Sequence, residues 1–206
     1  RHFGGRLAET ADGAIFLTMG DRGDRAAAQD PARHNGTIVR IDPGRGTAVF
    51  TKGHRNPQGL AFDLGGQLWA HEHGARGGDE INRIDKGKNY GWPVIAYGTH
   101  YSGAKIGEGT AKDGFEQPVF HWDPSVAPSG LAIHSGKNWP AMAGRFLVGS
   151  LKFDHIAVMA VGGSEQVGKI ETRETRRVRD VREGPFGGIW FLSEERGALY
   201  RIAPPK

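Results

Sequence analysis

The sequence predicts an all-β protein, and three observations support this prediction. Glycine accounts for 33 of the 206 residues and proline for 11, a content of chain-breaking residues that favours many turns between short strands. Apolar or alternating runs of strand length recur along the whole chain, each bounded by glycine, aspartate, asparagine or proline. No long segment has the apolar periodicity of a helix, and only residues 24–33 are expected to form a helical turn or two.

The expected strands follow one another along the chain, and β-branched and aromatic residues are frequent in them. They are residues 14–19, 36–41, 67–71, 144–149, 156–161, 188–192 and 198–202. A strand–turn–strand unit also repeats in degenerate form. Residues 59–63 with 65–70 resemble 180–185 with 187–192, and looser copies begin at Gly5 and Gly130.

The spacing of these copies predicts the architecture. Their starts lie roughly 50 to 70 residues apart, which is the length of a four-stranded propeller blade with insertions. The sequence therefore predicts a β-propeller of four-stranded antiparallel blades, about four of which this chain supplies. A β-sandwich, which also has regular hairpins, is the alternative.

Length and composition restrict the class of protein. A chain of 206 residues with 37% hydrophobic and 24% charged residues is long enough for one domain or for part of a larger single-core fold, and residues 1–206 are expected to be the C-terminal portion of a single domain. The absence of cysteine excludes disulfides, thiolate metal sites and thiol nucleophiles. A net charge of +4 spread along the chain gives no reason to expect nucleic acid binding. No apolar stretch approaches the roughly 20 residues of a membrane-spanning helix.

A proline-fixed polar turn precedes the strand that ends near residue 62. Arg55 offers a rigid fork of donors suited to an anionic or carbonyl oxygen. Asn56 is followed by Pro57, which favours an extended backbone and so fixes where the amide of Asn56 points. From the residues alone, this turn is either a binding element or ordinary polar surface.

Residues 71–82 are expected to end a strand and open a polar loop. His71 and His73 alternate onto one face, as a zinc site would require, but no third ligand is identifiable. Several glycines leave backbone carbonyls accessible, and Asp79 and Glu80 add carboxylates. Oxygen ligands without sulfur suit calcium, so this segment is either a calcium site or an ordinary acidic loop.

The segment 173–182 is unusually rich in arginine. If it enters a strand, Arg177 and Arg179 share a face, and two converging guanidiniums bind carboxylates or phosphates in a bidentate manner. The alternative is an edge strand whose charge prevents aggregation. Asp21, which follows a strand, either orients an imidazole or forms an Asx turn. Lys152 also follows an apolar strand, and by itself this position does not indicate a function.

Together and in this order, these segments resemble the glucose/sorbosone dehydrogenase family, the soluble quinoprotein aldose dehydrogenases that use pyrroloquinoline quinone (PQQ). Any one motif is weak, but the ordered set is specific and spans nearly the whole chain. The resemblance is carried by residues 2–7, 53–62, 72–74, 79–82, 89–93, 126–130, 150–152 and 177–181.

The resemblance implies a six-bladed propeller with the cofactor on top near its axis. The chain starts at Arg1 without methionine or signal peptide, and we expect roughly 100 to 150 upstream residues, about 50 per blade, to complete the ring. It also implies oxidation of an aldose at C1 to a lactone, with an external electron acceptor. A periplasmic or secreted location is inferred from the resemblance only.

The resemblance also implies roles in catalysis. His2 corresponds to the general base that removes the anomeric hydroxyl proton while hydride passes to the quinone, and Asp21 to the carboxylate that orients it. Arg55 corresponds to the arginine that polarises the quinone carbonyl, and Asn56 to a neighbouring cofactor contact. The cations that hold the cofactor correspond to Lys152, Arg177 and Arg179.

Calcium and sugar sites follow from the same resemblance. The carbonyls of Gly74 and Ala75 correspond to ligands of a calcium ion against the cofactor. Many members have proline at the position of Ala75, a difference that a backbone ligand tolerates. A second calcium ion corresponds to Glu80 and the carbonyl of Tyr90. The walls of the sugar site are expected at Phe120 and Trp122.

Two other functions stay open at this point. One is a non-catalytic propeller whose cationic residues bind an acidic partner. The other is a calcium-dependent lactonase-type propeller, although such a site would gather carboxylate and asparagine ligands where arginine and lysine dominate here. The quinone-enzyme interpretation requires that Arg55, Lys152 and the Arg177/Arg179 pair meet His2 around one axial pocket.

Overall fold

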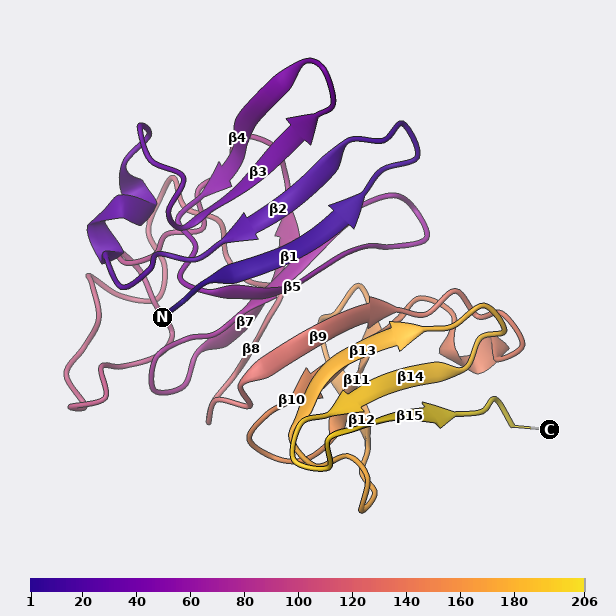
Figure 1. Cartoon of the computed structure of the whole chain (residues 1–206). Coiled ribbons are helices and arrows are strands. Elements are labelled where there is room, and N and C mark those ends of the chain that lie inside the picture. Colours follow the sequence, from indigo (N-terminus) through magenta and orange to yellow (C-terminus); the bar gives the residue numbers. More distant parts are fainter. Residues whose placement is uncertain (206) are drawn as a thin grey trace. The chain divides into compact units, whose positions relative to one another are not determined.

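The computed structural model describes residues 1–205 and contains fifteen β-strands and two short 3-10 helices (Figure 1). The chain divides into two compact units. The first contains residues 1–60 and 68–125, and the second contains residues 61–67 and the chain from Val126 onward. Neither of the helices that the structure describes has the length and apolar character needed to cross a membrane.

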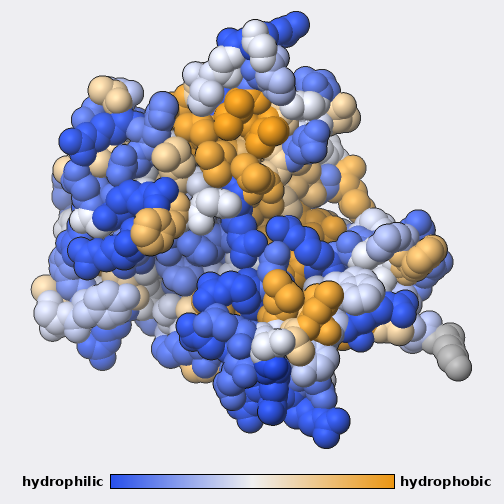
Figure 2. Space-filling view, viewed as in Figure 1, coloured by the Kyte–Doolittle hydropathy of each residue, from blue (hydrophilic) through white to orange (hydrophobic). Residues whose placement is uncertain are grey.

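The first sheet has four antiparallel strands in chain order, as in a propeller blade. One row of cross-strand neighbours in the middle of the sheet is apolar: Leu17 lies opposite both Leu7 and Val39, and Val39 lies opposite Val49. Leu7 and Val49 are exposed, and Figure 2 shows apolar side chains gathered over this sheet. The strands are β1 (Gly4–Glu9), β2 (Ile15–Met19), β3 (Thr37–Asp42) and β4 (Gly46–Lys52).

The second sheet is also antiparallel with its strands in chain order. It corrects one prediction, because residues 79–84 form a strand rather than part of a polar loop. Asp79 is fully buried there, which is possible because its carboxylate accepts hydrogen bonds from the backbone of Gly74 and the hydroxyl of Ser125. The strands are β5 (Pro57–Phe62), β6 (Leu68–Glu72), β7 (Asp79–Ile84) and β8 (Phe120–Trp122).

The second unit contains the other two sheets. One has four strands, β9 (Pro128–Ile133), β10 (Arg145–Ser150), β11 (Ile156–Val161) and β12 (Gln166–Ile170), and the other has three, β13 (Val178–Glu183), β14 (Ile189–Ser193) and β15 (Ala198–Ile202). The last sheet therefore differs from the expected four strands within the described residues. The core of this unit consists of Ala132, Met142, Leu147, Ile156, Val178, Val181, Ile189 and Phe191.

These sheets confirm the predicted fold class. Every sheet is a meander of consecutive strands, whereas a sandwich exchanges strands between two sheets. The repeated strand–turn–strand units are the first two strands of each sheet, and the expected helical turn is the 3-10 helix η1 (Arg25–Gln29). A second short helix, η2 (Pro140–Met142), precedes β10.

A long connection from β7 to β8 returns to the first sheet. Trp92 from this connection packs with Ala28 and Ile106. The backbone nitrogen of Trp92 donates to the carbonyl of Gly53 at 2.9 Å. Gly53 has a φ of +80°, and a Cβ atom there would collide with the side chain of Asn89. The close approach therefore depends on glycine, and it brings residues 89–92 against the polar turn that contains Arg55.

Candidate active site

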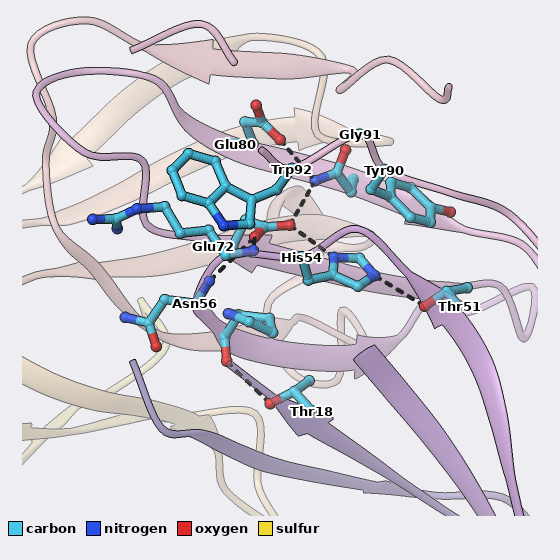
Figure 3. A network of polar contacts seen from close by, with 12 residues as sticks. Thr18, Thr51, His54, Asn56, Glu72, Glu80, Tyr90, Gly91 and Trp92 are labelled. Atoms are coloured by element: carbon cyan, nitrogen blue, oxygen red, sulfur yellow. Dashed lines mark hydrogen bonds and ion pairs between the residues drawn. The ribbon is translucent and has the colours of Figure 1, made fainter. Parts of the chain in front are cut away.

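The carboxylate of Glu72, at the end of β6, is the centre of a buried polar network (Figure 3). Its Oε2 accepts hydrogen bonds from the backbone nitrogens of Arg55 at 2.6 Å and Asn56 at 3.3 Å. Its Oε1 lies 2.8 Å from Nδ1 of His54, whose Nε2 lies 2.9 Å from the hydroxyl of Thr51. One carboxylate thus holds the turn through consecutive residues, and the backbone of Arg55 has little freedom to move.

The side chain of Arg55 is directed back across this turn. Its Nη1 donates to the carbonyls of His73, at 3.1 Å, and Gly74. Its guanidinium carbon lies 5.3 Å from the centre of the Trp92 ring, within the range of a cation–π interaction. Burial lowers the pKa of Arg55, against the opposing effects of Tyr101 and Asp21. Its buried Nε has no hydrogen-bond partner among the described residues, so one donor of a cationic group is left unused.

His2 and Asp21 form a close pair beside this arginine. Nδ1 of His2 lies 2.6 Å from Oδ1 of Asp21. Asp21 is fully buried, and it also accepts hydrogen bonds from the backbone of Gly23 at 2.7 Å and from the indole Nε1 of Trp92 at 2.9 Å. Burial acts to raise the pKa of Asp21, but the hydrogen bonds from His2, Gly23 and Trp92 together lower it. Asp21 is therefore an anion that holds an imidazole.

The geometry of His2 leaves its other ring nitrogen available. With Nδ1 on Asp21, Nε2 makes no hydrogen bond to any residue in the described range 1–205. His2 has a φ of +54°, a conformation that costs a non-glycine residue about 1–3 kcal/mol and is enriched at functional sites. The backbone nitrogen of Asp21 donates to the carbonyl of Arg55 at 2.9 Å, and Gly4 donates to the amide oxygen of Asn56 at 3.3 Å. The structure thus brings together four of the predicted site residues.

The predicted calcium ligands line one small cavity in the first unit. Gly74, Ala75, Glu80 and Tyr90 surround it with Glu72 and other residues, and its volume is about 20 Å³. That volume holds one water-sized particle. Burial and the nearby carboxylate of Glu72 raise the pKa of Glu80 well above its usual range, against a hydrogen bond from Asn82.

The predicted ligands at this cavity all offer oxygen atoms, which suits calcium, and Arg55 and His73 line the same cavity. The amide of Asn82 bridges Glu72 and Glu80, at 3.4 Å and 3.2 Å. Its own buried side-chain oxygen has no hydrogen-bond partner within the described chain. This oxygen is therefore an acceptor that is left unused at the site. The carbonyl of Gly74 accepts from Arg55 in this structure and retains a second lone pair. No group of three or more His, Cys, Asp or Glu side chains with metal-site geometry occurs in residues 1–205.

In the second unit, Arg177 and Arg179 converge on one carboxylate. Nε of Arg177 lies 3.1 Å from one oxygen of Glu194, and Nη2 of Arg179 lies 2.6 Å from the other. Arg177 has a φ of +49°, and its backbone nitrogen donates to Asp154 at 2.9 Å. Lys152 lies 5.0 Å from the centre of the Phe153 ring. The arginine pair is therefore arranged to bind a carboxylate, and in this structure it binds one from the protein itself.

Comparison with known proteins shows the family to which the chain belongs. Residues 1–201 match the family described as glucose/sorbosone dehydrogenase. The chain belongs to this family. Aldose sugar dehydrogenase YliI of Escherichia coli K12 is 40% identical over 223 residues, covering 98% of this chain and 60% of that protein. The chain therefore spans well under two thirds of the length of this relative.

Solved structures of the glucose/sorbosone dehydrogenase type have the same fold. The crystal structure of the soluble aldose sugar dehydrogenase from Escherichia coli, in the apo form, superposes with a TM-score of 0.91 at 39% identity, covering 98% of this chain and 64% of that one. The PQQ-bound aldose sugar dehydrogenase from Streptomyces coelicolor gives a TM-score of 0.73 at 29% identity, covering 93% and 55%.

Two predicted residues of this glucose/sorbosone dehydrogenase family member do not line the cavity. Phe120 and Trp122 are on β8, with their ring centres 5.0 Å apart in an edge-to-face arrangement. Trp122 is buried, and neither residue is among the described residues that line the calcium-type cavity. Their assignment to the sugar site remains a prediction.

Sequence reasoning missed the residues that hold this site in place. Glu72 and Trp92 lie within motifs that carried the resemblance, yet no role was predicted for either. Trp92 is 71 positions from Asp21 along the chain, so no local pattern indicates their contact. The one available signal for Glu72 was an acidic residue at the end of an apolar strand, because such a group needs several donors when it is buried.

Proposed function

We propose that this protein is a PQQ-dependent oxidoreductase that oxidises aldose sugars at C1 to lactones and passes the electrons to an external acceptor. The observation that carries the proposal is the His2–Asp21 pair, whose aspartate is hydrogen-bonded through its backbone to Arg55. Sugar oxidation of this kind needs a base for the hydroxyl proton and a fixed cation for the developing negative charge. This arrangement supplies both within one compact unit.

His2 is the general base in this proposal. Asp21 holds Nδ1, which leaves Nε2 to accept the proton of the anomeric hydroxyl. The buried carboxylate of Asp21 then stabilises the imidazolium that forms, as the aspartate does in a catalytic triad. When bound, PQQ supplies the quinone that accepts the hydride from C1. Arg55 and Asn56 are held by Glu72 and act as a cation and an amide in fixed positions.

The cofactor carboxylates would be held by Arg177 and Arg179, with Lys152 as a further cation. Support comes from the ion pairs of both arginines with Glu194, because an arginine pair that binds one carboxylate can bind another. The unused Nε of Arg55 fits an additional acceptor.

Calcium would be held by Glu80 and by the carbonyls of Gly74, Ala75 and Tyr90, since all four residues line the same cavity. We further propose that residues 1–206 belong to a single propeller domain and that the protein is periplasmic or secreted.

Reconstitution tests the function directly. The full-length apo-protein is incubated with PQQ and calcium chloride, and the reduction of a dye is followed with and without aldoses. We expect aldose-dependent reduction that requires both additions and that falls at least about 100-fold in His2→Gln, while PQQ binding to that variant is retained. Binding of PQQ without turnover would instead support a non-catalytic module. Full turnover in His2→Gln would remove the role assigned to the histidine.

A further inference from the structure

Trp92 connects the two halves of the site. Its indole Nε1 donates to Oδ2 of Asp21 at 2.9 Å, while its ring lies below the guanidinium carbon of Arg55 at 5.3 Å. The side chain is buried, and its backbone is fixed by the hydrogen bond to Gly53 at 2.9 Å. One rigid side chain thus contacts both the partner of the proposed base and the proposed cation.

We propose that Trp92 is a positioning residue whose indole N–H sets the basicity of His2 through the Asp21 carboxylate. This inference rests on the proposed function, in which His2 is the base. A hydrogen bond to a carboxylate disperses its negative charge. Trp92 and His2 donate to different oxygens of the same carboxylate. Each of these hydrogen bonds therefore weakens the other hydrogen bond to Asp21. Trp92 therefore weakens the stabilisation that Asp21 gives to a protonated His2.

The surroundings keep the carboxylate in place when the indole N–H is removed. Gly23 donates to the same Oδ1 atom that His2 contacts, at 2.7 Å, and the Asp21 backbone is tied to Arg55 at 2.9 Å. Loss of the indole donor is therefore expected to change the charge on Asp21 rather than its direction. The expected sign follows: with one donor fewer, Asp21 stabilises the imidazolium of His2 more strongly.

Apart from His100, the charged groups named around the pair are arginines, which do not titrate near neutral pH. Arg55 lies on one side through its backbone bond to Asp21. Arg22 lies over the ring of Phe3 at 4.5 Å, and Arg25 lies 5.8 Å from the centre of the Trp92 ring. Arginine stays protonated throughout this range. His100 contacts Arg25 at 3.4 Å and is one step removed from Trp92, so its resonance must be followed separately.

The test uses the uniformly labelled full-length apo-protein, so it does not depend on cofactor binding. The imidazole of His2 is titrated by NMR in the wild type and in Trp92→Phe, which keeps an aromatic ring beside Arg55 and removes the N–H. We expect the His2 midpoint to rise by roughly 0.5–1 pH unit in Trp92→Phe. The matched control, Trp139→Phe, alters a half-buried tryptophan of the second unit and is expected to leave the midpoint unchanged.

A second measurement needs no variant and therefore survives a folding defect. In the wild type, the indole N–H resonance of Trp92 is expected to shift with pH at the same midpoint as His2, because both groups share Asp21. An unchanged or lower His2 midpoint in folded Trp92→Phe, or an indole resonance insensitive to His2, would overturn the inference. In reconstituted enzyme, the acidic limb of kcat/KM should move upward with the midpoint; if no turnover is obtained, the NMR result still stands and only the proposed function fails.

Discussion

The backbone nitrogen of Asp21 donates a hydrogen bond to the carbonyl oxygen of Arg55 at 2.9 Å. This bond joins the end of β2 to the turn before β5, and so ties the aspartate that holds His2 to the arginine that we propose as the fixed cation. Side-chain contacts repeat the same connection through Trp92. The proposed base and the proposed cation therefore belong to one hydrogen-bonded unit, and we expect them to move together.

Acid sensitivity should report the ion pair of Asp21. Because the folded-state pKa of Asp21 lies below its ordinary value of 3.8, the carboxylate stabilises the folded protein above that value and loses its contribution as the pH falls through the folded pKa. The stability advantage of wild type over Asp21→Asn is thus expected to shrink as the pH falls below about 4. Urea unfolding at several pH values measures it, with the exposed Asp113→Asn as control. An advantage that does not shrink in this acidic range would contradict this.

Removing the charge of Glu72 should loosen the polar turn. Glu72→Gln replaces an acceptor-only group by one that carries donors, opposite the backbone nitrogens of Arg55 and Asn56. Leaving such buried partners unsatisfied is expected to lower the free energy of unfolding by about 2–4 kcal/mol. Urea denaturation provides the measurement, and Glu195→Gln, at an exposed position, should change it by less than about 0.5 kcal/mol. Equal stability of the two variants would show that the network is dispensable.

Gly53 and Gly44 separate backbone strain from crowding. Both have positive φ angles, +80° and +75°, but a Cβ atom at Gly44 meets nothing, whereas one at Gly53 meets Asn89 and Gly91. Alanine at Gly44 should cost about 1–2 kcal/mol from the left-handed backbone alone. Alanine at Gly53 should cost about 3 kcal/mol or more, because crowding adds to the same strain. Thermal or urea unfolding of both variants tests this. Similar losses of unfolding free energy would mean that the loop at residues 89–91 moves aside without a measurable cost.

Glu194 should compete with any carboxylate ligand for Arg177 and Arg179. In Glu194→Gln the protein carboxylate is gone while the arginines remain, so the affinity of the full-length apo-protein for PQQ is expected to increase about 2- to 10-fold. Calorimetric or fluorescence titration gives the Kd. Glu165→Gln, at an exposed position on the β11–β12 hairpin, removes the same charge elsewhere and serves as the control. Weaker binding in Glu194→Gln would mean that Glu194 orients the arginines instead of blocking them.

The sequence by itself determined the fold class, the repeated hairpins and the family. These features follow from patterns in neighbouring residues. The patterns are alternation along a strand, glycine at a turn, and motifs in a recognisable order. Even the pairing of His2 with Asp21 was implied by resemblance, and the structure places these two side chains 2.6 Å apart.

Only the tertiary structure decided how the site is held. It placed Asp79 in a buried strand, because partners at Gly74 and Ser125 satisfy its carboxylate. It set Trp92 between Asp21 and Arg55. The physical reason is common to these cases: a buried polar group depends on partners that packing brings from distant segments, and no pattern in adjacent residues specifies which partners those are.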